Sequence, residues 1–167
     1  MTKGWINMVV AIAAVALGGC ETVPTGGVGR GVAALPASPT AGPAETAVLF
    51  ARARAAEVEP RIHSIIALDP TAIAQARAID SAGRVGPLAG KPILLKDNIE
   101  SAGPLPTTAG SLALKDNVTG RDAPLVSRLR SAGAIILGKS NLSEWANIRD
   151  TKSISGWSAV GGQTRNP

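Results

Sequence analysis

The sequence predicts an α/β fold that contains a pair of parallel strands joined by a helix. Two short apolar runs, at 92–95 and 134–137, are typical of buried strands. An amphipathic segment at 124–132 separates them, and a strand, a helix and a strand in that order favour a right-handed parallel crossover. The length of 167 residues predicts about one domain.

The composition excludes several functional classes. Hydrophobic residues make up 45% of the chain and charged residues 17%, which is not the composition of a disordered tail. The 17 basic and 12 acidic residues leave a net charge of +5, too thinly spread for a nucleic-acid footprint. One cysteine cannot form an internal disulfide, and one cysteine with one histidine disfavours a zinc site. We therefore expect no metal, no cofactor and no nucleic-acid partner.

The first 20 residues have the anatomy of an export signal. Lys3 precedes an apolar run at 8–17, and small residues and Cys20 follow it. The run is shorter than the roughly 20 apolar residues that span a bilayer, so residues 1–19 are interpreted as a signal peptide rather than as a buried core helix. Leu-Gly-Gly-Cys at 17–20 resembles the lipobox of bacterial lipoproteins. The resemblance implies that Cys20 is lipidated and that the protein lies in the cell envelope, at the periplasmic face of the outer membrane in a Gram-negative cell.

Residues 20–43 are expected to form a flexible tether, because they are rich in glycine and proline and show no apolar periodicity. The predicted domain then occupies 44–167 and begins with an alanine-rich helix at 44–58. Asp69, followed by a proline, predicts the start of a second helix. Apolar residues recur at helical spacing after it, and Gly83 ends the helix.

The later elements surround the two predicted strands. Asp122 is expected to cap the helix at 124–132, and Gly133 to end it. A short helix is predicted at 142–147.

The chain finishes with a polar, glycine-rich segment at 153–167, and two strands offer little sheet for the helices to cover. We therefore expect the front third of a larger domain.

Two patterns match functional sites by residue type alone. Residues 133–140 match the phosphate-loop pattern G-x-x-x-x-G-K-S, but their four middle residues form the predicted strand and a helix precedes them. A phosphate loop requires a strand before it and turn residues between its glycines, so we expect no nucleotide at Lys139. His63 is interpreted as a surface helix residue rather than as a general base.

The tripeptide Lys-Asp-Asn occurs twice, at 96–98 and at 115–117. The second copy lies in a polar turn. The first copy follows an apolar strand, where partial burial of Lys96 would favour the neutral amine that can act as a base. From position alone, Lys96 can be either a surface lysine or a base.

Four blocks resemble the amidase signature family and occur in the family's order. They lie at 86–99, 106–111, 134–147 and 161–167. The similarity covers about residues 57–167, and Ser-Gly-Trp-Ser at 155–158 is most similar to the peptide-amidase branch. The resemblance implies the N-terminal portion of the amidase signature fold, a mixed, mostly parallel sheet covered by helices, incomplete in this chain. It also implies an enzyme that hydrolyses amide C–N bonds.

The family's mechanism uses a Ser–Ser–Lys triad, and Lys96 matches the catalytic lysine by position. In the family, both serines lie in a Gly/Ser-rich segment that begins shortly after the Asn-Pro found here at 166–167, and this chain contains no Gly-Ser-Ser segment. The resemblance therefore implies that only the lysine of the triad is present and that this chain alone is inactive. Four residues are expected to border the acyl pocket: Ser155, Gly156, Trp157 and Ser158.

The expected partners are a small-molecule or peptide amide and, through Cys20, a membrane. Two alternatives to the hydrolase remain. One is the amidotransferase subunit that supplies ammonia to tRNA-bound substrates in the cytoplasm, which the export signal disfavours. The other is a non-catalytic surface lipoprotein that kept the fold and lost the chemistry. A downstream Gly-Ser-Ser segment and a later nucleophilic serine would favour the enzyme.

Overall fold

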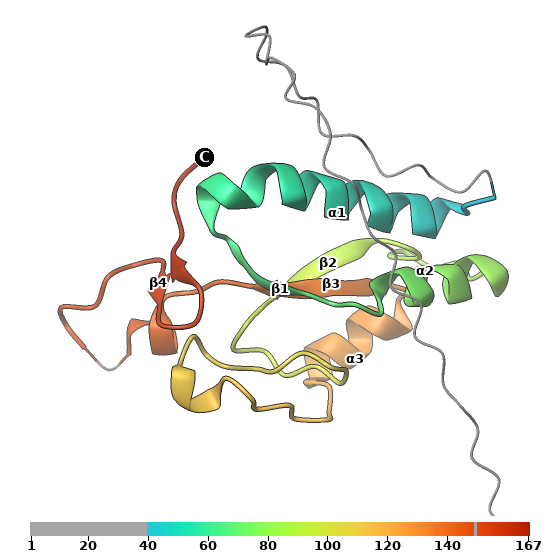
Figure 1. The fold of residues 1–167 in the computed structure, drawn as a ribbon. Helices are drawn as coiled ribbons and strands as arrows, with labels where there is room; N and C mark the ends of the chain where they lie inside the picture. The colour runs from blue at the N-terminus through green and yellow to red at the C-terminus, as the bar shows by residue number, and fades with distance from the viewer. Residues whose placement is uncertain (1–39, 149) are drawn as a thin grey trace, which may run out of the picture. The chain divides into compact units, whose positions relative to one another are not determined.

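A computed structural model describes residues 40–148 and 150–167 of the chain (Figure 1). The predicted signal peptide at 1–19, Cys20 and most of the predicted tether at 20–43 lie outside the described residues. No helix within the described ranges has the length and apolar character needed to cross a membrane.

The main sheet has three strands in the order β1-β3-β2. β2 (Pro92–Lys96) runs parallel to β3 (Ile135–Ser140), and α3 (Pro124–Ser131) connects them, so the predicted parallel crossover is confirmed. β1 (Ile65–Leu68) pairs with β3 in the antiparallel direction. We did not predict β1 from the sequence, although its four apolar residues resemble the two runs that we predicted as strands. Periodicity alone does not distinguish so short a run from part of a helix.

Helices cover both faces of this sheet (Figure 1). α1 (Pro43–Ile62) and α2 (Ala72–Ser81) pack on one face, and α3 packs on the other. The core below α1 and α2 consists of Ala44, Val48, Ala72, Ala76, Ile135 and Leu137. The core below α3 consists of Leu95, Val126 and Ile136. Each large aliphatic side chain buried in this way stabilises the fold by about 1.5–3 kcal/mol.

An extra residue in β3 decides toward which face of the sheet the side chains at the carboxyl end of β3 point. β2 and β3 pair in register up to Ile136, after which β3 contains one residue more than β2, at Leu137. Side chains alternate along a strand, and a bulge restarts this alternation. Lys139 therefore shares the α3 face with Ile136 and stands beside Leu95.

The predicted starts of two helices need correction. Asp122 does not cap α3, because its Oδ1 accepts a hydrogen bond from the Ala102 N–H (2.6 Å) and its Oδ2 pairs with Arg130. Asp69 Oδ1 accepts a hydrogen bond from the N–H of Thr71 (2.7 Å), within a turn that precedes α2. Both carboxylates stabilise loops next to the helices rather than the first helical turns.

The segment at 142–147 is not the predicted right-handed helix. It contains a 3₁₀ turn, Glu144–Asn147, in which Trp145 and Ala146 have φ values of 49° and 54°. Each non-glycine residue in this left-handed region costs about 1–2 kcal/mol. The Trp145 N–H donates a hydrogen bond to the carbonyl of Ala109 (2.9 Å), a long-range contact that helical spacing cannot reveal.

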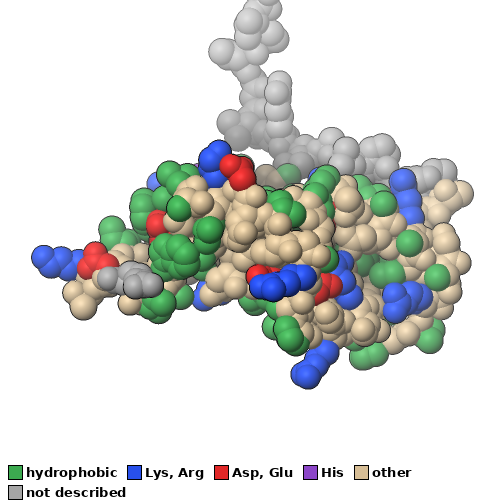
Figure 2. All heavy atoms as spheres, turned by 90° about the horizontal axis from the view of Figure 1, so that it is seen from below, with side chains coloured by type: hydrophobic (Ala, Val, Ile, Leu, Met, Phe, Trp, Pro, Cys, Tyr) green, Lys and Arg blue, Asp and Glu red, His purple; other side chains and the backbone are tan. Residues whose placement is uncertain are grey.

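Seen from below the sheet, basic and hydrophobic side chains are scattered over the surface and intermixed (Figure 2). This face therefore offers a ligand no single dominant patch of charge.

Asp80 in α2 caps the N-terminus of α1. Its two carboxylate oxygens accept hydrogen bonds from the backbone N–H groups of Ala44 and Glu45, each 2.9 Å long. The N-cap residue of α1 itself is Gly42, which has no side chain to do this. The first turn of α1 is therefore tied to α2.

We expect Asp80→Ala to lower the free energy of unfolding by about 1–2 kcal/mol, the usual range for a lost N-cap. Asp80→Asn should lower it less, because an amide retains one acceptor oxygen. Urea denaturation followed by circular dichroism measures both variants. The control is Glu57→Ala, which removes an exposed ion pair of little energetic weight. Equal stability of Asp80→Ala and the control would contradict the capping role.

Candidate active site

The carboxyl ends of β2 and β3 bring the candidate residues together. These parallel strands end at one edge of the sheet, where Lys96 pairs with Ser140. β1 begins at the same edge, with Ile65 opposite Ser140. In open α/β sheets, ligands bind outside the carboxyl ends of the strands. This edge is therefore the candidate active site.

Lys96 is the last residue of β2, and it is exposed. Because Lys96 is exposed, the partial burial expected from the sequence is not found among the described residues. Its ammonium makes no hydrogen bond or ion pair with the described part of the chain. Its backbone, in contrast, is fixed. The Lys96 carbonyl accepts a hydrogen bond from the N–H of Ile99 (2.9 Å), and the N–H of Asp97 donates to the carbonyl of Ser140 (3.2 Å).

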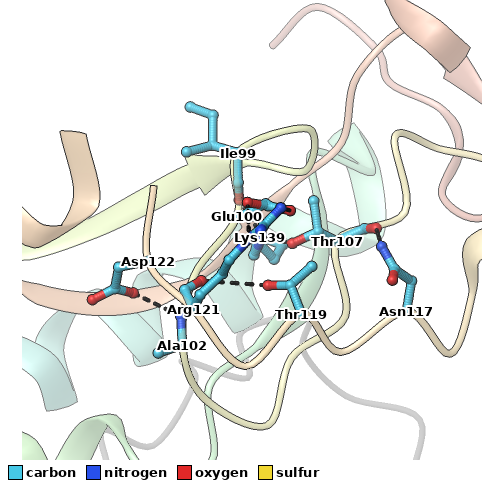
Figure 3. A network of polar contacts seen from close by, with 9 residues as sticks. All are labelled: Ile99, Glu100, Ala102, Thr107, Asn117, Thr119, Arg121, Asp122 and Lys139. Atoms are coloured by element: carbon cyan, nitrogen blue, oxygen red, sulfur yellow. Dashed lines mark hydrogen bonds and ion pairs between the residues drawn. The ribbon is translucent and has the colours of Figure 1, made fainter. Parts of the chain in front are cut away.

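A buried ion pair follows Lys96 in the structure, and it was not predicted from the sequence. Asp97 and Lys139 are 0% and 1% exposed, and Lys139 Nζ lies 3.8 Å from Asp97 Oδ1. Lys139 Nζ donates hydrogen bonds to the carbonyl of Ile99 (2.7 Å) and to Thr107 Oγ1 (2.9 Å), as Figure 3 shows. Asp97 Oδ2 accepts hydrogen bonds from the N–H and the hydroxyl of Thr108.

Burial shifts both members of this pair toward their neutral forms. It raises the pKa of Asp97, while the hydrogen bond from Thr108 and the charge of Lys139 act in the opposite direction. It lowers the pKa of Lys139, opposed by the negative charges of Asp97 and Glu100. Two groups that burial destabilises in their charged forms depend on each other, because removing one leaves the other buried and unpaired.

Lys139 belongs to the segment that matches the phosphate-loop pattern. The structure places this segment in β3, as expected from the sequence, and directs the ammonium at a carbonyl and a hydroxyl of the protein. In the sequence, Lys139 stands two residues after the predicted strand at 134–137, which gives no sign of its burial. The face on which Lys139 lies depends on the bulge at Leu137, which the sequence does not show.

Asn141 fixes the C-terminal hairpin beside this edge. The hairpin consists of β4 (Trp157–Ser158) and β5 (Gly162–Gln163), which pair in the antiparallel direction. Asn141 Nδ2 donates to Thr164 Oγ1 (3.0 Å), and Asn141 Oδ1 accepts from Ser158 Oγ (2.7 Å). The hairpin that carries the residues predicted to border an acyl pocket is therefore bonded to Asn141, one residue beyond the end of β3.

Those four residues differ in their surroundings. Ser158 is fully buried, and its hydroxyl is engaged in hydrogen bonds that hold the hairpin. Gly156 donates its N–H to a neighbouring serine hydroxyl, and Ser155 is exposed. Trp157 is 41% exposed and lines a cavity of about 490 Å³ together with Trp145. Of the four, Trp157 is placed to contact a ligand in that cavity.

His63 forms the C-cap of α1 in a left-handed conformation, with φ of 51°, and it is exposed. Its carbonyl accepts a hydrogen bond from Thr164 Oγ1 (2.8 Å), which again ties the C-terminal hairpin to the sheet edge. Across residues 40–148 and 150–167, no group of three His, Cys, Asp or Glu side chains could hold a metal ion.

The profile of the Amidase family matches residues 46–167, which is most of the chain. The chain belongs to the amidase family. This membership accounts for the fold of the sheet.

Similar proteins include amidases and amidotransferase subunits. A probable amidase of Arabidopsis thaliana is 44% identical over 117 residues, covering 66% of this chain and 23% of that protein. A glutamyl-tRNA(Gln) amidotransferase subunit of Nitratidesulfovibrio vulgaris is 46% identical over 127 residues, covering 74% of this chain and 25% of that protein. The crystal structure of the peptide amidase from Stenotrophomonas maltophilia aligns with a TM-score of 0.70 and 52% identity, over 74% of this chain and 26% of that chain.

These likenesses confirm the predicted mixed α/β fold of the amidase signature family. The chain spans about a quarter of the length of these relatives.

We expect Asp97→Ala to lower the free energy of unfolding by about 3–5 kcal/mol, because it leaves the Lys139 ammonium buried without its counter-charge. The second Lys-Asp-Asn copy supplies a matched control. The carboxylate of Asp116 is exposed and pairs with Lys115 at the surface (3.2 Å), so Asp116→Ala should change stability by no more than about 0.5 kcal/mol. Denaturant unfolding of both variants tests this, and a similar small effect for each would show that the buried pair is not needed.

Proposed function

We propose that this chain contributes the lysine of an amide hydrolase with a Ser–Ser–Lys triad, and that Lys96 is the proton acceptor. The observation that best supports this role is the position of Lys96. It is an exposed amine on a fixed backbone, at the carboxyl edge of the sheet, in a chain of the amidase family. Both serines of the triad are proposed to come from outside these 167 residues.

The proposed reaction requires Lys96 as the neutral amine, a form that parts of the enzyme outside these 167 residues are proposed to favour by covering this edge of the sheet. The neutral amine takes a proton from the first serine, which takes one from the second. The second serine attacks the carbonyl carbon of the amide, the C–N bond breaks, and the amine leaves with a proton. Water then hydrolyses the acyl-enzyme ester. Backbone N–H groups stabilise the negatively charged oxygen in both steps.

The cavity beside the C-terminal hairpin supports an amide whose acyl side is apolar or aromatic. Trp145, Ile154 and Trp157 line it, together with charged side chains from the same loops. The 52% identity to a peptide amidase supports peptide amides as the first substrates to test.

An amidotransferase subunit that acts on tRNA-bound substrates is the second candidate, because a protein of that kind is 46% identical over 74% of this chain. The proposed export signal at 1–19 favours the hydrolase, since tRNA-bound substrates are in the cytoplasm.

We also propose that lipid on Cys20 anchors the enzyme in the cell envelope, supported by the lipobox-like sequence at 17–20.

In the enzyme that contains this chain, we expect Lys96→Ala to lower kcat by about 10²–10⁴ or more, because the proton relay loses its acceptor. Lys115→Ala is the matched control. It lies in the exposed copy of Lys-Asp-Asn and should keep activity near that of the wild type. Steady-state kinetics with an aryl amide and a peptide amide measure both. An active Lys96→Ala enzyme beside an inactive Lys115→Ala enzyme would place the chemistry on the other lysine.

For the proposed anchor, we expect the wild-type protein to incorporate labelled fatty acid in a bacterial host and to partition into detergent. Cys20→Ser should abolish the labelling, because serine has no thiol to form the thioether. A wild-type protein that stays unlabelled and remains in the aqueous phase would rule out the lipid anchor.

A further inference from the structure

The turn at 96–99 fixes the starting point of the Lys96 side chain. Within it, the Lys96 carbonyl accepts the N–H of Ile99 (2.9 Å). The turn is also tied to its surroundings through Asp97, whose N–H donates to Ser140 (3.2 Å) and whose carbonyl accepts the N–H of Ala109 (3.0 Å). Since the amine of Lys96 has no partner among the described residues, its location depends on this backbone.

The ammonium of Lys139 joins this turn to two other parts of the chain. It donates to the carbonyl of Ile99 (2.7 Å) at the end of the turn and to the hydroxyl of Thr107 (2.9 Å), while its own backbone belongs to β3 (Figure 3). Thr107 is in turn anchored by Asn117, which donates from Nδ2 to the Thr107 carbonyl and accepts the Thr107 N–H on its own carbonyl, each at 2.9 Å.

An apolar side chain at Lys139 could fill the same space. Well-packed hydrophobic residues often replace a buried ion pair without loss of stability. They cannot replace its direction, because only a hydrogen-bond donor fixes the distance and angle to the Ile99 carbonyl and the Thr107 hydroxyl. The buried ammonium thus orients the turn in a way that hydrophobic packing does not.

From this arrangement, and on the basis of the proposed function, we infer that Lys139 is a positioning residue for Lys96. Lys139 holds the 96–99 turn against Thr107 and so sets where the Lys96 amine lies. Lys139 does not touch the substrate in this role. Its contribution is to the pre-organisation of the proton acceptor, and a misplacement of about 1 Å can cost about 10²-fold in rate.

The test uses Thr107→Val, which keeps the shape of the side chain and removes one of the two hydrogen-bond acceptors of Lys139. Thr107→Ser restores the hydroxyl, and Thr119→Val removes a hydroxyl that bonds elsewhere, to the Arg121 carbonyl (3.3 Å). If Thr107→Val fails to fold, Thr107→Ala, which is smaller, removes the same acceptor.

The first measurement is amide hydrogen exchange by NMR on this chain, and it does not depend on activity. We expect the Ile99 amide to exchange about tenfold faster or more in Thr107→Val, while the Ile136 amide in β3 keeps its wild-type rate. Thr107→Ser and Thr119→Val should both match the wild type. An unchanged Ile99 amide in Thr107→Val would overturn the positioning role, as would equal acceleration at Ile99 and Ile136, which would indicate general loosening.

The second measurement is kinetic, in the enzyme that contains this chain. We expect Thr107→Val to lower kcat about tenfold with KM within about threefold, and Thr107→Ser to restore kcat. A wild-type kcat in Thr107→Val, beside an inactive Lys96→Ala, would overturn the positioning role and leave the proposed function standing. An active Lys96→Ala would instead overturn the proposed function, so the two failures are distinguishable.

Discussion

A carboxylate and an ammonium leave water only where protein groups replace their hydration. For Asp97 and Lys139, the replacements come from the hydroxyls of Thr107 and Thr108 and from the carbonyl of Ile99. These groups belong to the turn after β2 and to the loop that follows it, and Lys139 itself belongs to β3. Burying the pair therefore requires these three segments to meet at one point. That point adjoins Lys96, and the candidate active site is thus assembled by the need to satisfy two buried charges.

The sheet is shaped to bring Lys139 to this point. The bulge at Leu137 moves Lys139 from the face of α1 and α2 to the face of α3. Gly138 follows the bulge, where a Cβ atom would collide with the carbonyl oxygen of Ala67 in β1. A glycine at this position lets the antiparallel neighbour approach closely, and the bulge turns the side chain of the next residue, Lys139, toward the other face of the sheet. One irregularity in β3 therefore couples the packing of β1 to the burial of Lys139.

The regular part of the fold could be predicted from the sequence, because apolar periodicity and helix-ending glycines act locally. The crossover from β2 through α3 to β3 is of this kind, and so are α1 and α2. For the candidate site, Lys96 stays a prediction from the sequence, and the Asp97–Lys139 pair was not predicted. Its formation depends on the bulge at Leu137 and on hydroxyls from a distant loop, which leave no periodic signal. The left-handed turn at Trp145 was missed for a similar reason, since a long-range hydrogen bond overrides local preference there.

The central claim is that Asp97 and Lys139 act as one unit that holds the three segments together. A double-mutant cycle with Asp97→Asn, Lys139→Met and the combined variant tests it most directly, through the free energies of unfolding in urea. The account predicts a coupling energy of about 1–3 kcal/mol, with the double variant more stable than the sum of the single losses implies. Additivity within about 0.5 kcal/mol would contradict it, because the two side chains would then act independently.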